Sequence, residues 1–129
     1  MIVKRSLALK NARANAHLSA FNGGLIGFYD GAMPTDGEAI TTQTLLCTIA
    51  LPTPSGTVDA GVFALSPNLE AMVLVQGIPT WCRITDSASD WVQDMDVGID
   101  GSGAAVIVTP GTLYAGGSLR IERLRLIEP

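Results

Sequence analysis

The first 24 residues place their apolar side chains with the period of an α-helix. These apolar positions are separated by seven, four and three residues and are Leu7, Ala14, Leu18 and Phe21. That spacing aligns them in one narrow stripe of a helix that we predict over residues 5–21. Ser6 or Asn11 could cap its start, and the Asn and Gly residues at 22–24 favour the left-handed backbone that ends a helix. A thin, alanine-rich stripe predicts packing on a sheet edge or on another chain.

After residue 24 the pattern changes to short apolar runs separated by Gly, Pro, Asn and Asp, which is typical of strands and tight turns. The predicted strands span residues 25–29, 44–51, 57–65, 71–76, 80–85, 91–99, 104–108 and 118–127. The polar run 86–90 predicts a hairpin turn, and residues 100–103 predict a second turn. Strict alternation within 91–99 places Met95 and Val97 on one face and aspartates on the other.

The closing strand changes phase along its length. Leu119 and Ile121 are apolar at odd positions, whereas Leu124 and Leu126 continue at even positions. One extra residue near 122–123, a β-bulge, would keep all four side chains on the core face.

Strands at roughly ten-residue spacing with one leading helix predict an all-β fold: an antiparallel β-sandwich or jelly roll with one N-terminal α-helix. A length of 129 residues fits one domain with a sizeable core. We expect residues 1–24 to form a basic arm and helix and residues 25–129 to form the β-sandwich, both within one structural unit.

The formal net charge of −4 divides unevenly along the chain. Residues 1–13 carry a net +4, residues 14–118 a net −9, and residues 119–129 a net +1. An acidic body repels phosphate backbones, so we expect no nucleic-acid partner. The basic start could dock on an acidic protein surface or be a solvated helix face.

Neither the search for targeting segments nor the two cysteines changes the interpretation of the chain. No apolar run approaches the roughly 18 residues that cross a bilayer, and polar residues interrupt any secretory signal in the first 20 positions. We therefore expect no membrane association. Cys47 and Cys82 are expected to be reduced thiols packed as small hydrophobes, with no metal-ligand spacing around them.

Candidate chemistry is sparse. His17 is the only histidine, so a nucleophilic dyad would have to join it to Cys47 or Cys82, and we favour a structural role for these residues. The nucleophile-elbow, phosphate-loop and zinc-protease motifs are absent from the sequence. We expect no enzymatic activity and no cofactor.

Two weaker possibilities concern the second half of the chain. Asp94, Asp96 and Asp100 loosely follow a calcium loop, although the remaining acidic ligands of such a loop are missing; the alternative is a solvated acidic strand face. Trp81 and Trp91 flank the predicted hairpin and are expected to lie near one another, as a core or interface pair or as a platform for sugar. A carboxylate pair for glycoside hydrolysis is not excluded by sequence alone.

Several of these strand and turn segments together resemble small virion proteins of tailed bacteriophages, encoded among head and tail morphogenesis genes. The segments that carry the resemblance are LSAFNGG at 18–24, LIGFYDG at 25–31, Pro34, TLLCT at 44–48, TWCRITDS at 80–87, VG at 97–98 and GSGA at 101–104. The similarity spans about residues 12–128. Gly and Asn are sparse at 57–70, where the chain departs from the family's pattern.

The resemblance implies a structural virion protein assembled in the host cytoplasm. Our first expectation is a capsid decoration (cement) protein that contacts the major capsid protein and itself, as a dimer or trimer. A tail, baseplate or fibre component and a carbohydrate-binding module are the alternatives. The basic side chains expected to make the contacts are Lys4, Arg5, Lys10, Arg13, Arg120, Arg123 and Arg125.

Overall fold

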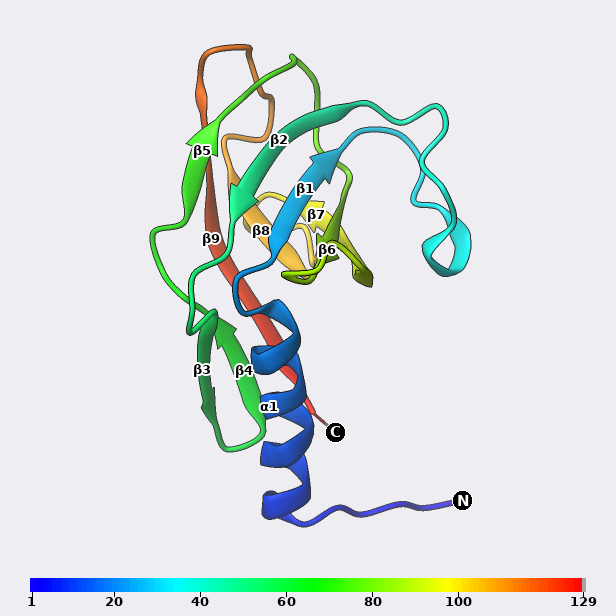
Figure 1. Cartoon of the computed structure of the whole chain (residues 1–129), viewed down its shortest axis with the longest axis vertical. Coiled ribbons are helices and arrows are strands. Elements are labelled where there is room, and N and C mark those ends of the chain that lie inside the picture. The colour runs from blue at the N-terminus through cyan, green and yellow to red at the C-terminus, as the bar shows by residue number, and fades with distance from the viewer. Residues whose placement is uncertain (129) are drawn as a thin grey trace.

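The computed structural model describes residues 1–128 and is mostly β, with one α-helix preceding the strands (Figure 1). A single-turn 3-10 helix, η1, lies between the first two strands. The elements in chain order are α1 (Leu7–Phe21), β1 (Leu25–Tyr29), η1 (Thr35–Gly37), β2 (Leu45–Ala50), β3 (Gly56–Asp59), β4 (Val62–Leu65), β5 (Glu70–Met72), β6 (Trp81–Thr85), β7 (Trp91–Gly98), β8 (Val106–Thr109) and β9 (Ser118–Ile127).

The helix ends at Phe21 as predicted, and it begins at Leu7, two residues later than predicted. The Ser6 side chain accepts a hydrogen bond from the backbone N–H of Leu9, which satisfies one of the unpaired donors at the first turn. Asn22 follows the last helical residue, and Gly23 then takes a positive φ of 68°. The buried side chains of the stripe are Ala14 and Phe21.

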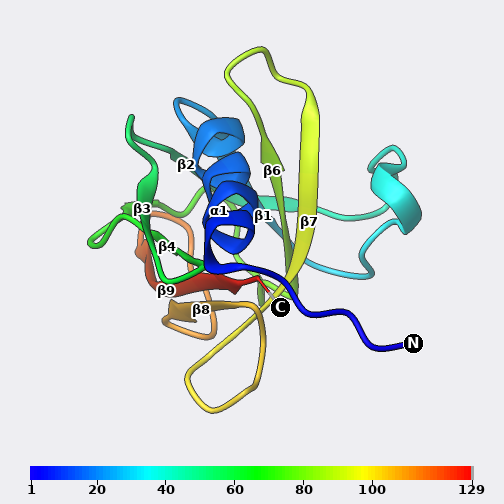
Figure 2. The ribbon, with the colours of Figure 1, turned by 90° about the horizontal axis from the view of Figure 1, so that it is seen from below.

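Helix α1 covers the hairpin formed by β3 and β4, as the view from below shows (Figure 2). Phe21 meets Phe63 of β4 edge to face, with ring centroids 5.3 Å apart. The hairpin turns at Ala60 and Gly61, both with positive φ, so residues 57–65 form two strands where the sequence predicts one. The helix therefore packs on an edge of the sheet, as its thin apolar stripe predicts.

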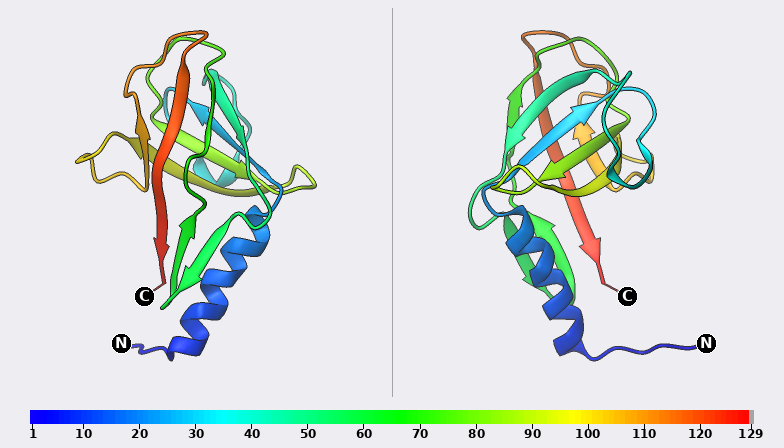
Figure 3. Two further views of the ribbon diagram at one scale, coloured as in Figure 1. Left: turned by 90° about the vertical axis from the view of Figure 1, so that its left-hand side faces the viewer. Right: turned by 45° about the vertical axis from the view of Figure 1, so that its right-hand side comes forward.

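The strands form one curled sheet in the order β2-β1-β6-β7-β8-β9-β4-β3, with β5 pairing to β9 (Figure 3). The sheet curls so that β2, at one end of this order, lies beside the segment just after β5, where the backbone N–H groups of Leu74 and Val75 donate to the carbonyl of Leu46. The core fills the inside of this curl. Its largest fully buried side chains include Phe28, Leu46, Ile84, Leu113, Leu119 and Leu124.

The expectation of a purely antiparallel sheet is wrong at one place, and a sandwich or jelly roll is not confirmed. Strands β7 and β8 are parallel, with Val97 opposite Val106 and Gly98 opposite Ile107. The segment 99–105 leaves the end of β7 and returns beside Val97, so β8 runs in the same direction as β7 and the segment is not a hairpin turn. The backbone N–H of Ala105 donates to Asp96 Oδ1 at 2.8 Å and holds the returning chain in place.

The predicted bulge in β9 is confirmed. Val106 pairs with Leu124 and Ile107 with Arg123, but Val108 then pairs with Ile121, so Glu122 is the extra residue. As a result β9 keeps its apolar side chains toward the core on both sides of the bulge.

Candidate functional site

The outer face of β9 gathers three of the seven predicted contact residues. Arg120, Arg123 and Arg125 are exposed, whereas Leu119 and Leu124 on the inner face are at most 1% exposed. With regular alternation the odd positions 123 and 125 would point inward with Leu119. The bulge at Glu122 shifts the phase and so places all three guanidinium groups on one side of the strand. We call these three residues the arginine row.

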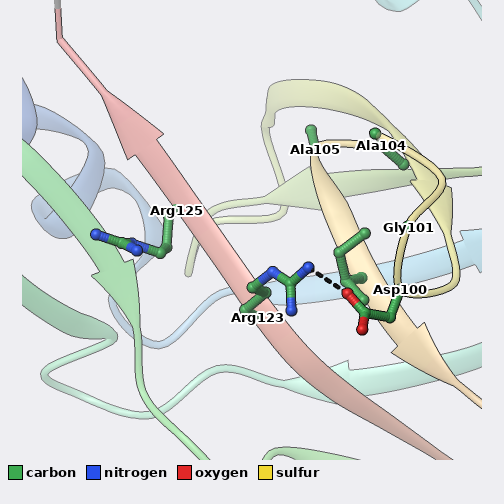
Figure 4. A pocket seen from close by; sticks show the side chains of 8 residues that line it. Asp100, Gly101, Ala104, Ala105, Arg123 and Arg125 are labelled. Carbon is green, nitrogen blue, oxygen red and sulfur yellow. Dashed lines mark hydrogen bonds and ion pairs between the residues drawn. The ribbon is translucent and has the colours of Figure 1, made fainter.

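An open pocket of about 520 Å³ lies beside the arginine row (Figure 4). Arg123 and Arg125 form one side, the loop 100–105 forms the other, and Ile107 contributes to the lining. Arg123 Nη2 lies 2.6 Å from Asp100 Oδ1, whereas the Arg125 side chain points away from Asp100. No ion pair of Arg125 is found within residues 1–128, so its charge faces the surroundings of the pocket.

Glycine residues determine the packing and the backbone conformation of the loop that forms this pocket. A Cβ atom on Gly98 would lie 2.3 Å from Ser102 Oγ, so the loop packs directly on the backbone at the end of β7. Gly101 and Gly103 take φ values of 88° and 79°, which residues with a side chain rarely adopt. Asp100 precedes this turn, and the hydrogen bond and charge of Arg123 lower the pKa of Asp100 below its ordinary value.

The four predicted contact residues at the start of the chain differ from the arginine row in their exposure and contacts. Lys4 and Arg5 precede α1 in the extended segment 1–6, where Lys4 is exposed. The Lys10 side chain packs over Gly61, the tip of the β3–β4 hairpin. Arg13 Nε lies 3.1 Å from Glu128 Oε2, just past the end of β9.

Glu128 is the anchor between the helix and the end of β9. Its side chain is only 9% exposed, and His17 Nε2 donates to its Oε1 at 2.9 Å while Arg13 pairs with its Oε2. The structure thus brings the two basic ends of the chain together, but through an internal ion pair of Arg13. The sequence pattern gave no sign of this, because the partners lie more than a hundred residues apart.

The three aspartates of the loosely calcium-like stretch do not converge. Asp94 accepts from Arg83 Nε and Nη2 at 2.8 and 2.9 Å, Asp96 accepts from Ala105, and Asp100 pairs with Arg123. The hydrogen bonds that Arg83 donates to Asp94 raise the pKa of Arg83. Within residues 1–128 no group of three or more His, Cys, Asp or Glu side chains could hold a metal ion.

The expected neighbourhood of the two tryptophans is wrong. The turn 86–90 places Thr85 opposite Trp91, so Trp81 pairs with Asp96 near the other end of the hairpin. Trp81 is 1% exposed, stacks on Tyr29 with ring centroids 4.7 Å apart, and donates to the backbone carbonyl of Asp30. Trp91 remains 48% exposed and lines a separate pocket of about 330 Å³.

The two cysteines are free and buried, on neighbouring parts of the sheet rather than near the helix. Burial raises the pKa of both Cys47 and Cys82, which favours the protonated, unreactive thiol. His17 is hydrogen-bonded to Glu128 and packs near Phe21 and Phe63. The structure therefore does not assemble the thiol–histidine dyad that the sequence left open.

Compared with known protein families, with curated proteins and with solved structures, the chain gives no match in any of the three searches. The bacteriophage resemblance accordingly stays a prediction from the sequence segments alone. None of the helices within residues 1–128 is long and apolar enough to span a membrane.

Proposed function

We propose that this chain is a non-enzymatic structural protein of a tailed-bacteriophage virion, and that it decorates the capsid shell. In this role it binds neighbouring capsid subunits and adds buried interface between them. A partner that binds only the assembled shell stabilises that shell by mass action, without any chemical reaction.

The arginine row is the observation that carries this proposal. It puts three guanidinium groups on one outer strand face of a protein whose residues 14–118 have a net charge of −9. Arginine is enriched at protein interfaces because its planar group binds carboxylates in a bidentate manner. The row therefore suits an acidic surface of a partner protein, and Arg125 brings a charge with no ion pair found inside residues 1–128.

The scaffold behind the row supports an assembly role. Strand β9 is ten residues long and pairs with β8, β4 and β5, so the arginine row is held by three neighbouring strands. A rigid strand presents its side chains with less loss of conformational entropy on binding than a loop does. The choice of a phage capsid as partner rests on the resemblance of the strand and turn segments.

Localisation on particles tests the proposal. Antibody raised against the purified chain would be applied to phage particles produced by the organism that encodes it, followed by electron microscopy. We expect label over the heads. Label confined to tails would support the tail, baseplate or fibre alternative and overturn decoration, and particles without label would overturn both.

A carbohydrate-binding role is the second candidate, and exposed Trp91 is the observation that favours it. The ring lies over Gly37 and borders the pocket that Gln93 and Asp36 also line, which combines an aromatic surface with polar groups. Titration with a panel of neutral oligosaccharides should change the fluorescence of Trp91 if this reading is right. The Trp91→Phe variant is the control, because it leaves buried Trp81 as the remaining tryptophan.

A further inference from the structure

The arginine row is evenly spaced along the outer face of β9. Arg120 pairs with Thr109 of β8. Arg123 pairs with Ile107, which lies two residues before Thr109 and therefore on the same face of β8. The bulge accounts for the extra residue between these two arginines. Arg125 follows Arg123 by two residues, so successive guanidinium groups start from backbone positions about 6.8 Å apart.

This spacing is also that of an extended peptide. Side chains on one face of an extended chain recur at every second residue, again about 6.8 Å apart. Carboxylates match the planar geometry of a guanidinium group and form charge-assisted hydrogen bonds with it. A partner segment with Asp or Glu at every second residue would therefore present one carboxylate to each arginine of the row when it lies along β9.

The row already holds a carboxylate of the chain itself. Asp100 Oδ1 lies 2.6 Å from Arg123 Nη2, at the edge of the pocket in Figure 4. The Asp100 side chain is 73% exposed and the Arg123 side chain 51% exposed, and ion pairs as exposed as this one are weak. Within residues 1–128, the Nε and Nη1 groups of Arg123 have no hydrogen-bond acceptor. An incoming carboxylate can therefore replace Asp100 with little loss of free energy.

The pocket beside the row leaves room for this exchange. Its volume is about 520 Å³, and apart from Asp100 the loop that forms one side contributes only glycine and alanine to the lining. Ile107 adds an apolar wall on the outer face of β8, because its neighbours Val106 and Val108 belong to the core. A side chain with a carboxylate on a short aliphatic stem suits a hollow that has both a cationic and an apolar side.

Two other carboxylates lie near the row without pairing to it. Glu70 is opposite Arg120 on β5, and Glu122 is exposed on the bulge. Neither forms an ion pair within residues 1–128, and Arg125 has none there either. Two of the three guanidinium groups of the row therefore have no ionic partner inside this part of the chain.

We propose that the arginine row binds an extended acidic segment of a partner protein, with carboxylates at every second residue, and that one of these carboxylates replaces Asp100 on Arg123. Asp100 then acts as an internal competitor that is released when the partner binds. This inference rests on the proposed function only in assigning the row to a partner protein, because it specifies the chemistry of the bound segment and not the particle that carries it.

Two blocked synthetic peptides of the same composition test the spacing. Thr-Glu-Thr-Glu-Thr-Glu-Thr alternates its glutamates, and Thr-Thr-Glu-Glu-Glu-Thr-Thr groups them. Binding to the unmodified chain would be followed by NMR at low ionic strength, through the backbone amide signals of β9. We expect the grouped peptide to bind about threefold more weakly, because only two of its three carboxylates lie on one face of an extended chain. Equal or reversed affinities, or no binding of the alternating peptide, would overturn the proposal.

Two matched charge changes test the replacement of Asp100. Asp100→Asn and Glu122→Gln each remove one negative charge from an exposed residue, but within residues 1–128 only the first of these carboxylates pairs with Arg123. The Asp100 variant should bind the alternating peptide about threefold more tightly than the Glu122 variant does. Equal affinities would show that Asp100 does not compete for Arg123 and would overturn the exchange. Circular dichroism checks that both variants keep the fold.

The remaining outcomes separate this inference from its neighbours. The tetranucleotide of thymidine carries three phosphodiester charges, and tighter binding of it than of the alternating peptide would overturn the choice of a protein segment. Binding of the chain to phage heads without binding of the alternating peptide would overturn this inference and leave capsid decoration standing. Binding of the alternating peptide without binding to heads would do the opposite.

Discussion

The two faces of β9 differ in burial and in the chemistry of their side chains. The inner face carries Leu119, Ile121 and Leu124, which are 0–4% exposed and belong to the core. The outer face carries the arginine row, which no core contact requires. One bulged strand thus has a buried face that holds the fold and an exposed face that we propose binds a partner, so a change on one face should leave the role of the other intact.

Truncation on the two faces gives the largest contrast. Leu124→Ala should lower the free energy of unfolding by about 2–5 kcal/mol, because it leaves a cavity in a fully buried site. Arg125→Ala, one position away and exposed, should change it by no more than about 0.5 kcal/mol. Urea unfolding of both variants measures the difference, and equal losses would contradict the division of the strand.

The end of β9 offers a second, smaller contrast between two glutamates. Glu128→Gln removes the charge that Arg13 and His17 share, and we expect a loss of about 1 kcal/mol since Arg13 is partly exposed. Glu122→Gln, on the exposed bulge, should leave the free energy of unfolding unchanged. Hydrogen exchange should also rise in α1 of the Glu128 variant alone; identical protection in both variants would show that Glu128 does not anchor the helix.

The smallest effect concerns the ion pair on the outer face. Arg123 lowers the pKa of Asp100, so any stabilisation from this pair is present above the ordinary pKa of an aspartate and is lost as the pH falls through the lowered value. Arg123→Ala should return the pKa of Asp100 toward its ordinary value. Titration of the Asp100 carboxyl carbon by NMR in both proteins measures this, and an unchanged pKa would mean that the pair does not form in solution.

Local chemistry made much of the fold predictable. Ser6 and Gly23 mark the helix ends because capping depends on neighbouring residues, and the phase change around Glu122 predicts the bulge because side-chain alternation has a fixed period. The outward direction of Arg120, Arg123 and Arg125 follows from the same alternation. Each of these features depends only on residues that are close together in the sequence.

Features that depend on distant contacts were not predictable. The parallel pairing of β7 with β8 depends on the loop 99–105 and its bond to Asp96, whereas Gly and Ser at 100–103 equally suit a hairpin turn. The pocket beside the arginine row depends on Asp100 meeting Arg123, 23 residues away. The separation of the tryptophans has another cause: a regular register from the Thr85–Trp91 pair would place Trp81 opposite Met95, and the irregularity between Ile84 and Thr85 shifts its partner by one residue, to Asp96.

The role of the outer face of β9 is tested most directly by comparing binding and folding in one variant. Arg120→Ala, Arg123→Ala and Arg125→Ala would be combined, and the arginine-to-lysine triple variant, which keeps the charge, would serve as control. We expect the alanine variant to unfold within about 0.5 kcal/mol per substitution of the unmodified chain. It should also bind purified phage heads at least tenfold more weakly in co-sedimentation, with the lysine variant in between. Unchanged binding by the alanine variant would contradict the role assigned to the outer face of β9.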